Sequence, residues 1–380
     1  MNVYLDWAAT AIPEQEIIEE AVREAGKYFA NPSARHALGK AAAERLETAR
    51  KTAAECLQVQ PEQLIFTSGG TEANHIVLLS MLNRSESLNI AAGAIEHAAI
   101  SEQVKMLKKN GRKVREIPVN KRGFITPEAV LQTIDANTTL VTVMAVNNET
   151  GAIQPIREIG QAVSEFCKGK RKIHFHVDAV QAFGKIPFEL ANLPISSAAM
   201  SGHKIGAPRG IGFLYLAQTL EAFLCGGGQE GGMRAGTENL AGIIALAGCL
   251  QKTIPAVAKT YAHVQELSDY LIQKLLCIPG ISIIPETRME DCNNFSPYII
   301  QCTNENIPGE VLQRCLSDMG VYVSTGSACS SKKRSRPILE AMGIGAKQQL
   351  NTIRISLGKS TTKEELNQAL CCLQTCIEKL

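Results

Sequence analysis

Val-Asp-Ala-Val-Gln-Ala at residues 177–182 and Met-Ser-Gly-His-Lys-Ile at residues 200–205 carry the strongest fold signal in the chain. An apolar run over 173–177 leads into the first stretch, and a run of small residues over 196–200 leads into the second. Each run has the length and composition of a buried strand. Ligands of open α/β sheets bind at the carboxyl ends of parallel strands. The polar side chains that we expect together at such an edge are Asp178, Gln181, Ser201, His203 and Lys204.

Strand-like and helix-like segments alternate along the chain. The strands expected from short apolar runs cover 64–67, 90–93, 114–119, 140–146 and 211–215. The helices expected from amphipathic spacing cover 13–29, 39–57 and 155–167. This alternation predicts an α/β fold with a mostly parallel sheet flanked by helices. We expect residues 14–255 to form this large domain, and residues 1–13 with 256–380 to form a smaller α+β domain.

An acid after one strand and a lysine after the next are the pair that a pyridoxal phosphate site requires. The lysine forms the Schiff base, and the acid keeps the pyridine nitrogen protonated so that the ring withdraws electrons. A solvated surface ion pair is the alternative for any Asp and Lys. The position of Ser-Gly-His-Lys between two apolar runs favours the cofactor, with Asp178 as the acid and Lys204 as the lysine.

Two further segments suit the same cofactor. Thr-Ser-Gly-Gly-Thr-Glu-Ala-Asn at 67–74 turns from a strand into a helix, where backbone N–H groups and the Thr71 hydroxyl can hold a phosphate. Such turns also occur without phosphate. His97 follows another strand, where it either caps a helix or offers an aromatic surface and an acid–base group to a flat ring. Asn148 lies in a polar loop where its amide can reach a ligand.

Composition excludes several classes of function. A formal net charge of +2 over 380 residues makes no case for binding nucleic acid or an anionic membrane. No apolar run approaches the roughly 18 residues of a membrane span, and residues 1–13 lack the apolar core of a signal peptide. Twelve cysteines without a secretion signal are expected to be thiols in the cytoplasm. Because no C-x-x-C pair occurs, we expect no metal site.

Two loops have unusual composition. The glycine-dense run 225–232 leads to Arg-Ala-Gly-Thr at 234–237, and it is either a flexible connector or a loop fixed by a ligand or partner. The run 323–331 contains Cys329 among small polar residues, and the basic run 332–336 follows it. Positive charge next to an exposed cysteine favours the thiolate, although most exposed cysteines are incidental thiols.

In combination these motifs resemble the cysteine desulfurases of the nitrogenase-maturation and iron–sulfur-cluster type. These enzymes belong to the class V aminotransferase family, whose architecture is that of the fold type I pyridoxal phosphate-dependent transferases. The resemblance extends from Tyr-Leu-Asp at 4–6 to Ile-Arg-Ile-Ser-Leu-Gly at 353–358. Its further motifs are Glu-His at 96–97, Asn-Asn-Glu at 147–149, Arg-Ala-Gly-Thr at 234–237 and Ser-Thr-Gly-Ser-Ala-Cys at 324–329.

The resemblance implies a role for each matching residue. Lys204 would bind the cofactor and move a substrate proton, Asp178 would pair with the pyridine nitrogen, Gln181 would contact the ring hydroxyl, and His97 would stack on the ring. The residues implied for the phosphate are Gly70, Thr71, Ser201 and His203, together with Thr237 for the cofactor of a partner subunit, so that the active unit would be a homodimer.

The resemblance also implies the reaction. Asn148 and Arg354 would bind the substrate carboxylate, and Cys329 would be the nucleophile. L-cysteine would become L-alanine, and the sulfur would pass as a persulfide to an acceptor protein for iron–sulfur cluster assembly or tRNA thiolation. The alternatives are a selenocysteine lyase, another lyase or aminotransferase of this fold, and a sulfur-relay scaffold, which would have no use for Lys204 and Asp178.

The chain departs from the family pattern at several positions. Trp7 and Ala8 stand where the family often has Asn-Asn, Cys225 stands where His is common, and Gly231 stands where Arg is usual. The run 332–336 is unusually basic. These departures bear on the choice of acceptor and on the loops, while the residues implied for the cofactor are all present.

Overall fold

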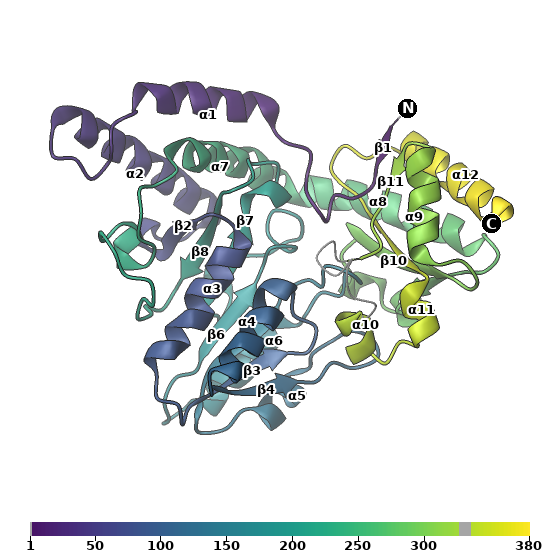
Figure 1. Cartoon of the computed structure of the whole chain (residues 1–380), viewed down its shortest axis with the longest axis horizontal. Helices are drawn as coiled ribbons and strands as arrows, with labels where there is room; N and C mark the ends of the chain where they lie inside the picture. Colours follow the sequence, from purple (N-terminus) through teal and green to yellow (C-terminus); the bar gives the residue numbers. More distant parts are fainter. Residues whose placement is uncertain (1, 327–335) are drawn as a thin grey trace.

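The computed structural model describes residues 2–326 and 336–380. The predicted nucleophile Cys329 lies outside the described residues. Within them, helices and strands alternate around one large sheet, and a second group of strands and helices formed mainly by the C-terminal part lies beside it (Figure 1).

Seven of the described strands form the large sheet, in the spatial order β2-β8-β7-β6-β5-β3-β4. Their bounds are β2 Leu64–Thr67, β3 Asn89–Gly93, β4 Lys113–Ile117, β5 Thr138–Met144, β6 His174–Asp178, β7 Ser197–Ser201 and β8 Gly212–Leu216. The pairs β7-β6, β6-β5, β5-β3 and β3-β4 are parallel, whereas β8 is antiparallel to both of its neighbours. The expected α/β fold with a mostly parallel sheet is confirmed.

Alternate residues of the strands are buried on opposite faces of this sheet, as a period of two requires. Leu214 and Leu216 of β8 join the apolar cluster under α3 and α4, whereas Phe213 and Tyr215 join the larger cluster on the other face. The helices of this part are α1 Gln15–Lys27, α2 Ala37–Leu57, α3 Gly70–Ser80, α4 Ala98–Lys109, α5 Pro127–Thr133, α6 Ile156–Phe166 and α7 Leu240–Thr253. Both faces are therefore covered by helices, as a parallel sheet requires.

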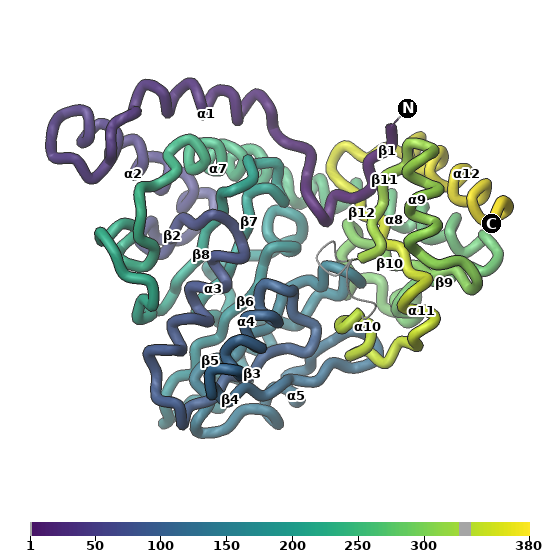
Figure 2. The backbone as a smooth tube through the Cα atoms, viewed as in Figure 1, coloured from purple at the N-terminus to yellow at the C-terminus, as the bar shows by residue number. Residues whose placement is uncertain are grey.

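The second group of elements is built on β9, β10 and β12, which form an antiparallel sheet in the order β12-β10-β9. Its elements are α8 Val257–Leu276, β9 Ile281–Ile284, β10 Ile299–Asn304, α9 Gly309–Asp318, β11 Val321–Tyr322, α10 Pro337–Ala341, α11 Ala346–Leu350, β12 Thr352–Ser356 and α12 Lys363–Lys379. The N-terminal strand β1 (Val3–Tyr4) pairs with β11, so the first residues of the chain lie among its last elements (Figure 2).

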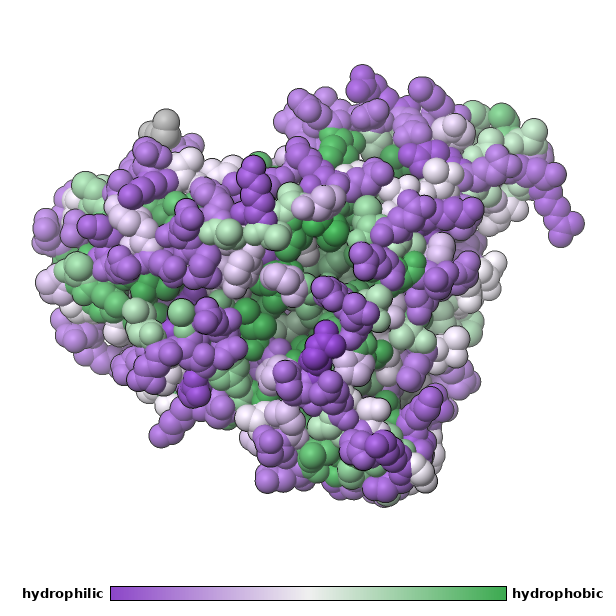
Figure 3. Space-filling model, turned by 180° about the vertical axis from the view of Figure 1, so that it is seen from behind, coloured by the Kyte–Doolittle hydropathy of each residue, from purple (hydrophilic) through white to green (hydrophobic). Residues whose placement is uncertain are grey.

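Most expected elements occur within about two residues of their predicted bounds, which is the usual precision for element ends. The sequence did not predict β11, β12, α5, α10 or α11, because each is short or lacks a clear period. Seen from behind, hydrophobic residues gather in a hollow near the middle of the surface, with hydrophilic residues around it (Figure 3).

One helical run differs from the expectation about membrane spans. The run Leu240–Leu276, which joins α7 and α8, is long and apolar enough to cross a membrane by length and composition alone. Half of its most apolar window is buried inside the protein, and α7 packs against α1 and α2. A buried core helix meets the same length and composition criterion, so the run is only weak evidence for a membrane span.

Candidate active site

A cavity of ≈ 260 Å³ lies at the carboxyl ends of β6 and β7. Because these two strands are parallel neighbours, the side chains just beyond their ends meet at one edge of the sheet. The predicted residues that line the cavity are Gly70, Thr71, His97, Asn148, Asp178, Gln181, Ser201, His203, Lys204 and Arg354. The structure thus brings together the cofactor and substrate residues that the sequence predicted for one subunit.

Asp178 is the last residue of β6, a strand that is buried along its whole length. Its Oδ2 accepts a hydrogen bond from Asn74 Nδ2 at 2.9 Å, and its Oδ1 accepts one from Val180 N at 3.0 Å. A carboxylate with both oxygens engaged cannot rotate freely. Asp178 is therefore held in one orientation beside the cavity.

Lys204 is the last residue of the short turn Gly202–Lys204 that follows β7. Its Nζ donates to the backbone oxygens of Ala8 at 2.5 Å and Ala9 at 2.8 Å. The N-terminal segment thus supplies acceptors for the predicted catalytic lysine.

Gln181 has two partners that fix the orientation of its amide. Its Nε2 donates to Ala8 O at 2.9 Å, and its Oε1 accepts from Lys185 Nζ at 2.8 Å. Lys185 is a buried residue whose pKa lies well below the usual range because of burial first, and then because of the nearby cations of Lys204 and Arg354. Lys185 was not among the residues predicted for the site, although a lysine inside the apolar run Ala182–Ile186 is a signal of a buried partner.

The turn before α3 leaves backbone donors at the cavity. Gly69 has φ +148°, and among the described residues no side chain caps the helix. A Cβ on Gly70 would lie 2.6 Å from Val180 Cγ2, so only glycine lets the first turn of α3 lie this close to the strand end. Thr71 is exposed in that first turn, and Ser201 is buried at the end of β7.

Two histidines border the cavity. His97 caps α4, since its Nδ1 accepts from Ala99 N at 3.1 Å, and this bond fixes the ring. Burial lowers the pKa of His97, although the Asp178 carboxylate acts in the opposite direction. Burial, and then the Lys204 ammonium, lower the pKa of His203 to about 4. Both imidazoles are therefore predominantly neutral near pH 7.

Arg354 links the two parts of the fold at the cavity. It lies on β12, and it donates from Nη1 to Asn148 O at 2.8 Å and from Nη2 to Asp6 Oδ1 at 2.9 Å. Within the described residues its Nε and the Oδ1 of Asn148 are buried without a hydrogen-bond partner. Buried polar atoms of this kind are costly unless a ligand or water satisfies them, so both atoms are suited to a polar ligand.

The residues present fit pyridoxal phosphate. The uncapped turn at Gly70 and the hydroxyls of Thr71 and Ser201 suit a phosphate, and Asp178 suits a protonated ring nitrogen. Lys204 stands at the same cavity with an amine for covalent attachment.

Two predicted residues are not in this cavity. Thr237 is exposed after the glycine-dense loop and does not line the cavity of its own chain. Cys329 lies outside the described residues, so its predicted role remains a proposal.

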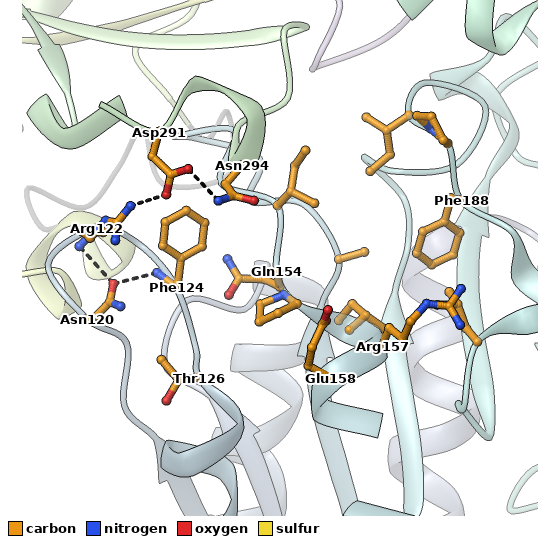
Figure 4. Close-up of a pocket in the computed structure, with 17 residues that line it drawn as sticks. Asn120, Arg122, Phe124, Thr126, Gln154, Arg157, Glu158, Phe188, Asp291 and Asn294 are labelled. Carbon is orange, nitrogen blue, oxygen red and sulfur yellow. Dashed lines mark hydrogen bonds and ion pairs between the residues drawn. The ribbon is translucent and has the colours of Figure 1, made fainter. Parts of the chain in front are cut away.

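A second cavity of ≈ 480 Å³ is larger and lies elsewhere (Figure 4). Arg122, Phe124 and Asp291 stand on one side of it, with the Arg122–Asp291 ion pair at its edge, and Phe188 stands on the other. None of the predicted site residues lines it. Among the described residues, no group of three or more His, Cys, Asp or Glu side chains is arranged to hold a metal ion.

Comparison with known proteins identifies the family of this chain. The family model described as aminotransferase class-V matches residues 3–369. A cysteine desulfurase IscS of Methanosarcina thermophila is 34% identical over 383 residues, which cover 100% of this chain and 92% of that protein. A NifS/IcsS protein homolog of Lactobacillus delbrueckii subsp. bulgaricus is 36% identical over 376 residues, covering 96% of this chain and 94% of that protein.

Solved structures give the same result. A structure titled NIFS-like protein superposes with a TM-score of 0.90 at 33% identity and covers 100% of both chains. A structure titled SspA in complex with cysteine has a TM-score of 0.80 at 28% identity, covering 95% of this chain and 100% of that one. The fold and the site define a pyridoxal phosphate-dependent enzyme of fold type I. The chain belongs to the class V aminotransferase family, and its resemblance to cysteine desulfurases is confirmed.

Proposed function

We propose that this chain is a cysteine desulfurase, which uses pyridoxal phosphate to convert L-cysteine to L-alanine and transfers the sulfur to an acceptor. The observation that carries the proposal is the single cavity at which Asp178, Lys204 and Arg354 meet. These three side chains provide a partner for the ring nitrogen, an attachment amine and a cation for an amino-acid carboxylate.

The substrate carboxylate binds at Arg354. The guanidinium is held from one side by Asn148 O and from the other by Asp6, which leaves Nε for the ligand. The carboxylate accepts from Arg354 Nε and from Asn148 Nδ2, the donor end of that side-chain amide. A second charge-assisted contact fixes the orientation of the amino acid and also raises its affinity for the site.

Lys204 moves the proton. The cofactor, when bound, supplies an electron-withdrawing ring that stabilises the negative charge left at the substrate Cα. The Lys204 amine takes the Cα proton, while the Ala8 and Ala9 carbonyls position its Nζ. Asp178, held by Asn74 Nδ2 and Val180 N, is the partner of the ring nitrogen.

Cys329 accepts the sulfur. Its thiolate attacks the Sγ of the bound cysteine, so an S–S bond forms as the substrate C–S bond breaks, and the carbon skeleton leaves as alanine. Cys249 and Cys302 are less suited, because burial raises the pKa of Cys249 to about 11 and that of Cys302 to about 12. Cys56 is half-buried and also has a raised pKa for the same reason.

The assembly and compartment complete the proposal. We propose a cytoplasmic homodimer in which Thr237 contacts the cofactor phosphate of the partner subunit, and its exposure outside its own cavity supports this. We also propose that residues 14–255 form one domain and that 1–13 and 256–380 form the other, because each part has its own sheet. The sulfur acceptor is a protein of iron–sulfur cluster assembly or of tRNA thiolation.

The test has two stages. The purified protein should be yellow from lysine-bound cofactor, and with L-cysteine it should form alanine and sulfide in equal amounts when a reducing thiol is present. A matched reaction with selenocysteine separates a desulfurase from a selenocysteine lyase. Colourless protein that cannot be reconstituted with pyridoxal phosphate would refute the proposal.

A further inference from the structure

A continuous chain of hydrogen bonds runs from Asp178 into the protein interior, away from the cavity. Asn74 Nδ2 donates to Asp178 Oδ2 at 2.9 Å, and Asn74 Oδ1 lies 2.8 Å from His176 Nε2. His176 Nδ1 lies 2.8 Å from Ser197 Oγ, which lies 2.7 Å from His174 Nε2. All five side chains are buried, and only Asn74 and Asp178 line the cavity.

The acceptor at Asp178 sets the direction of every bond in this chain. A carboxylate only accepts, so the Asn74 side chain must place its NH₂ toward Asp178 and its oxygen toward His176. The Asn74 oxygen also only accepts, so His176 must carry its proton on Nε2. His176 Nδ1 then accepts the hydroxyl proton of Ser197, and the Ser197 oxygen accepts from His174 Nε2–H.

Each ring in the chain carries one proton near neutral pH. Burial, and then His174, lower the pKa of His176 to about 3, although the Ser197 backbone acts in the opposite direction. Burial, and then Arg84, lower the pKa of His174 to about 4. A neutral imidazole has one donor nitrogen and one acceptor nitrogen. Each ring can therefore accept a hydrogen bond from one neighbour and donate one to the other, so that all the bonds of the chain point the same way.

We propose that Asn74, His176, Ser197 and His174 form a polarised hydrogen-bond chain that holds Asp178 as an acceptor toward the cofactor ring nitrogen. Asn74 and His176 are positioning residues, because they act through Asp178. The inference rests on the proposed function for the role of Asp178, but the direction of the chain does not depend on any cofactor. It assigns the Nε2–H tautomer to both histidines.

The same geometry allows one other consistent direction, and Asp178→Asn selects it. The oxygen of the substituted side-chain amide should remain on Val180 N–H, which places its NH₂ on Asn74. The Asn74 amide must then turn, so its NH₂ points at His176 Nε2 and the ring proton moves to Nδ1. His176 Nδ1 then donates to Ser197 Oγ, and the Ser197 hydroxyl donates to His174 Nε2. The ring proton of His174 must therefore lie on Nδ1 as well.

The first experiment uses the full-length protein without cofactor. Two-dimensional ¹⁵N–¹H correlation spectra of histidine-labelled protein distinguish Nε2–H, Nδ1–H and charged rings. At pH 7 the signals of His174 and His176 should both have the Nε2–H pattern, and in Asp178→Asn both should have the Nδ1–H pattern. Ser197→Ala is the matched control, since it breaks the chain beyond His176 and should leave that ring in the Nε2–H form.

The second experiment tests the effect on the cofactor. Titration with pyridoxal phosphate, followed by visible absorbance and circular dichroism, measures affinity and ring environment. His176→Leu should weaken binding by on the order of tenfold to a hundredfold, the scale for losing a hydrogen bond that supports a charged group. His176→Gln, whose amide can donate to Asn74 Oδ1, should recover most of the affinity and the wild-type spectrum.

The outcomes separate this inference from the proposed function. If wild-type protein fails to bind pyridoxal phosphate, the proposed function fails, whereas the tautomers still test the chain. The inference is overturned if either histidine has an Nδ1–H or charged pattern in the wild type. It is also overturned if His176→Leu is folded by circular dichroism and binds the cofactor with the affinity and spectrum of the wild type.

Discussion

The Arg50–Glu230 ion pair should be among the costliest single contacts to break. Arg50 lies on α2 and donates from Nη1 and Nη2 to the Glu230 carboxylate at 2.9 and 2.7 Å, and Phe66 N donates to the same carboxylate at 2.7 Å. Both side chains are at least nine-tenths buried. Arg50→Met removes two of the three donors and leaves a buried charge with one, which typically costs about 3–5 kcal/mol of unfolding free energy.

A neighbouring pair is the control. Arg45 of the same helix also makes two hydrogen bonds to one carboxylate, from Nε and Nη2 to Glu24, but its side chain is 18% exposed and that of Glu24 is 32% exposed. Arg45→Met should cost only about 0–1 kcal/mol, because water still solvates the remaining carboxylate. The difference between the two variants isolates the effect of burial.

Urea unfolding of the cofactor-free protein measures both changes. Far-ultraviolet circular dichroism follows the whole chain, and the fluorescence of Trp7, the only tryptophan, follows the N-terminal segment. Adding Glu230→Gln to Arg50→Met should recover part of the loss, since the amide is uncharged and its oxygen still accepts from Phe66 N. If Arg50→Met shifts unfolding no more than Arg45→Met does, the reasoning from burial is wrong.

Three further predictions concern the site and its surroundings. Lys204→Ala should lose the visible absorbance and the borohydride-reducible adduct of bound cofactor while remaining folded, and a persisting adduct would reassign the attachment lysine. Cys329→Ser should keep the absorbance but form alanine from cysteine at least about 10³-fold more slowly. Cys225→Ser, at an exposed thiol, should stay near the wild-type rate, and a fast Cys329→Ser would favour a selenocysteine lyase. His174 and His176 have folded pKa values of about 4 and about 3, below the unfolded value of 6.5. The unfolded chain therefore binds protons first at both rings, so these two rings should lower the unfolding free energy as pH falls from 6.5 to 4, and their own contribution is at most about 2.7 kcal/mol per pH unit for two protons. Urea midpoints between pH 4.5 and 7.5 measure this slope, and a flat profile would contradict it.

The strand-end residues of the site were predictable because two simple rules meet there. Apolar runs identify β6 and β7, and parallel strands present the residues at their carboxyl ends along one edge of the sheet. Asp178, Ser201 and Lys204 therefore follow from local sequence alone. Arg354 followed only from the family resemblance, because the sequence did not predict β12, the strand that carries it.

Buried polar residues were not predictable by the same rules. Arg50 and Glu230 are 180 residues apart and each stands in a segment where charged side chains are normally exposed. His176 lies in the middle of an apolar run, and the pattern of the run alone does not reveal that its ring contacts Asn74 from another element. Such pairs can be identified only from the tertiary fold, which places two polar groups together in an apolar interior. Burial of each group is tolerated only because the other group is its hydrogen-bond partner.

The N-terminal segment shows why a departure from the family pattern leaves the predicted site intact. Ala8 O accepts from both Gln181 and Lys204, and a backbone oxygen is present whatever side chain the residue carries. Trp7 acts differently: its ring packs against Gly358, where any side chain would clash with it, and its Nε1 donates to Tyr4 O at 3.1 Å. Trp7 therefore anchors the segment to the C-terminal part of the chain, while the acceptors offered to the predicted catalytic lysine are backbone oxygens, which do not depend on the side chains at 7 and 8.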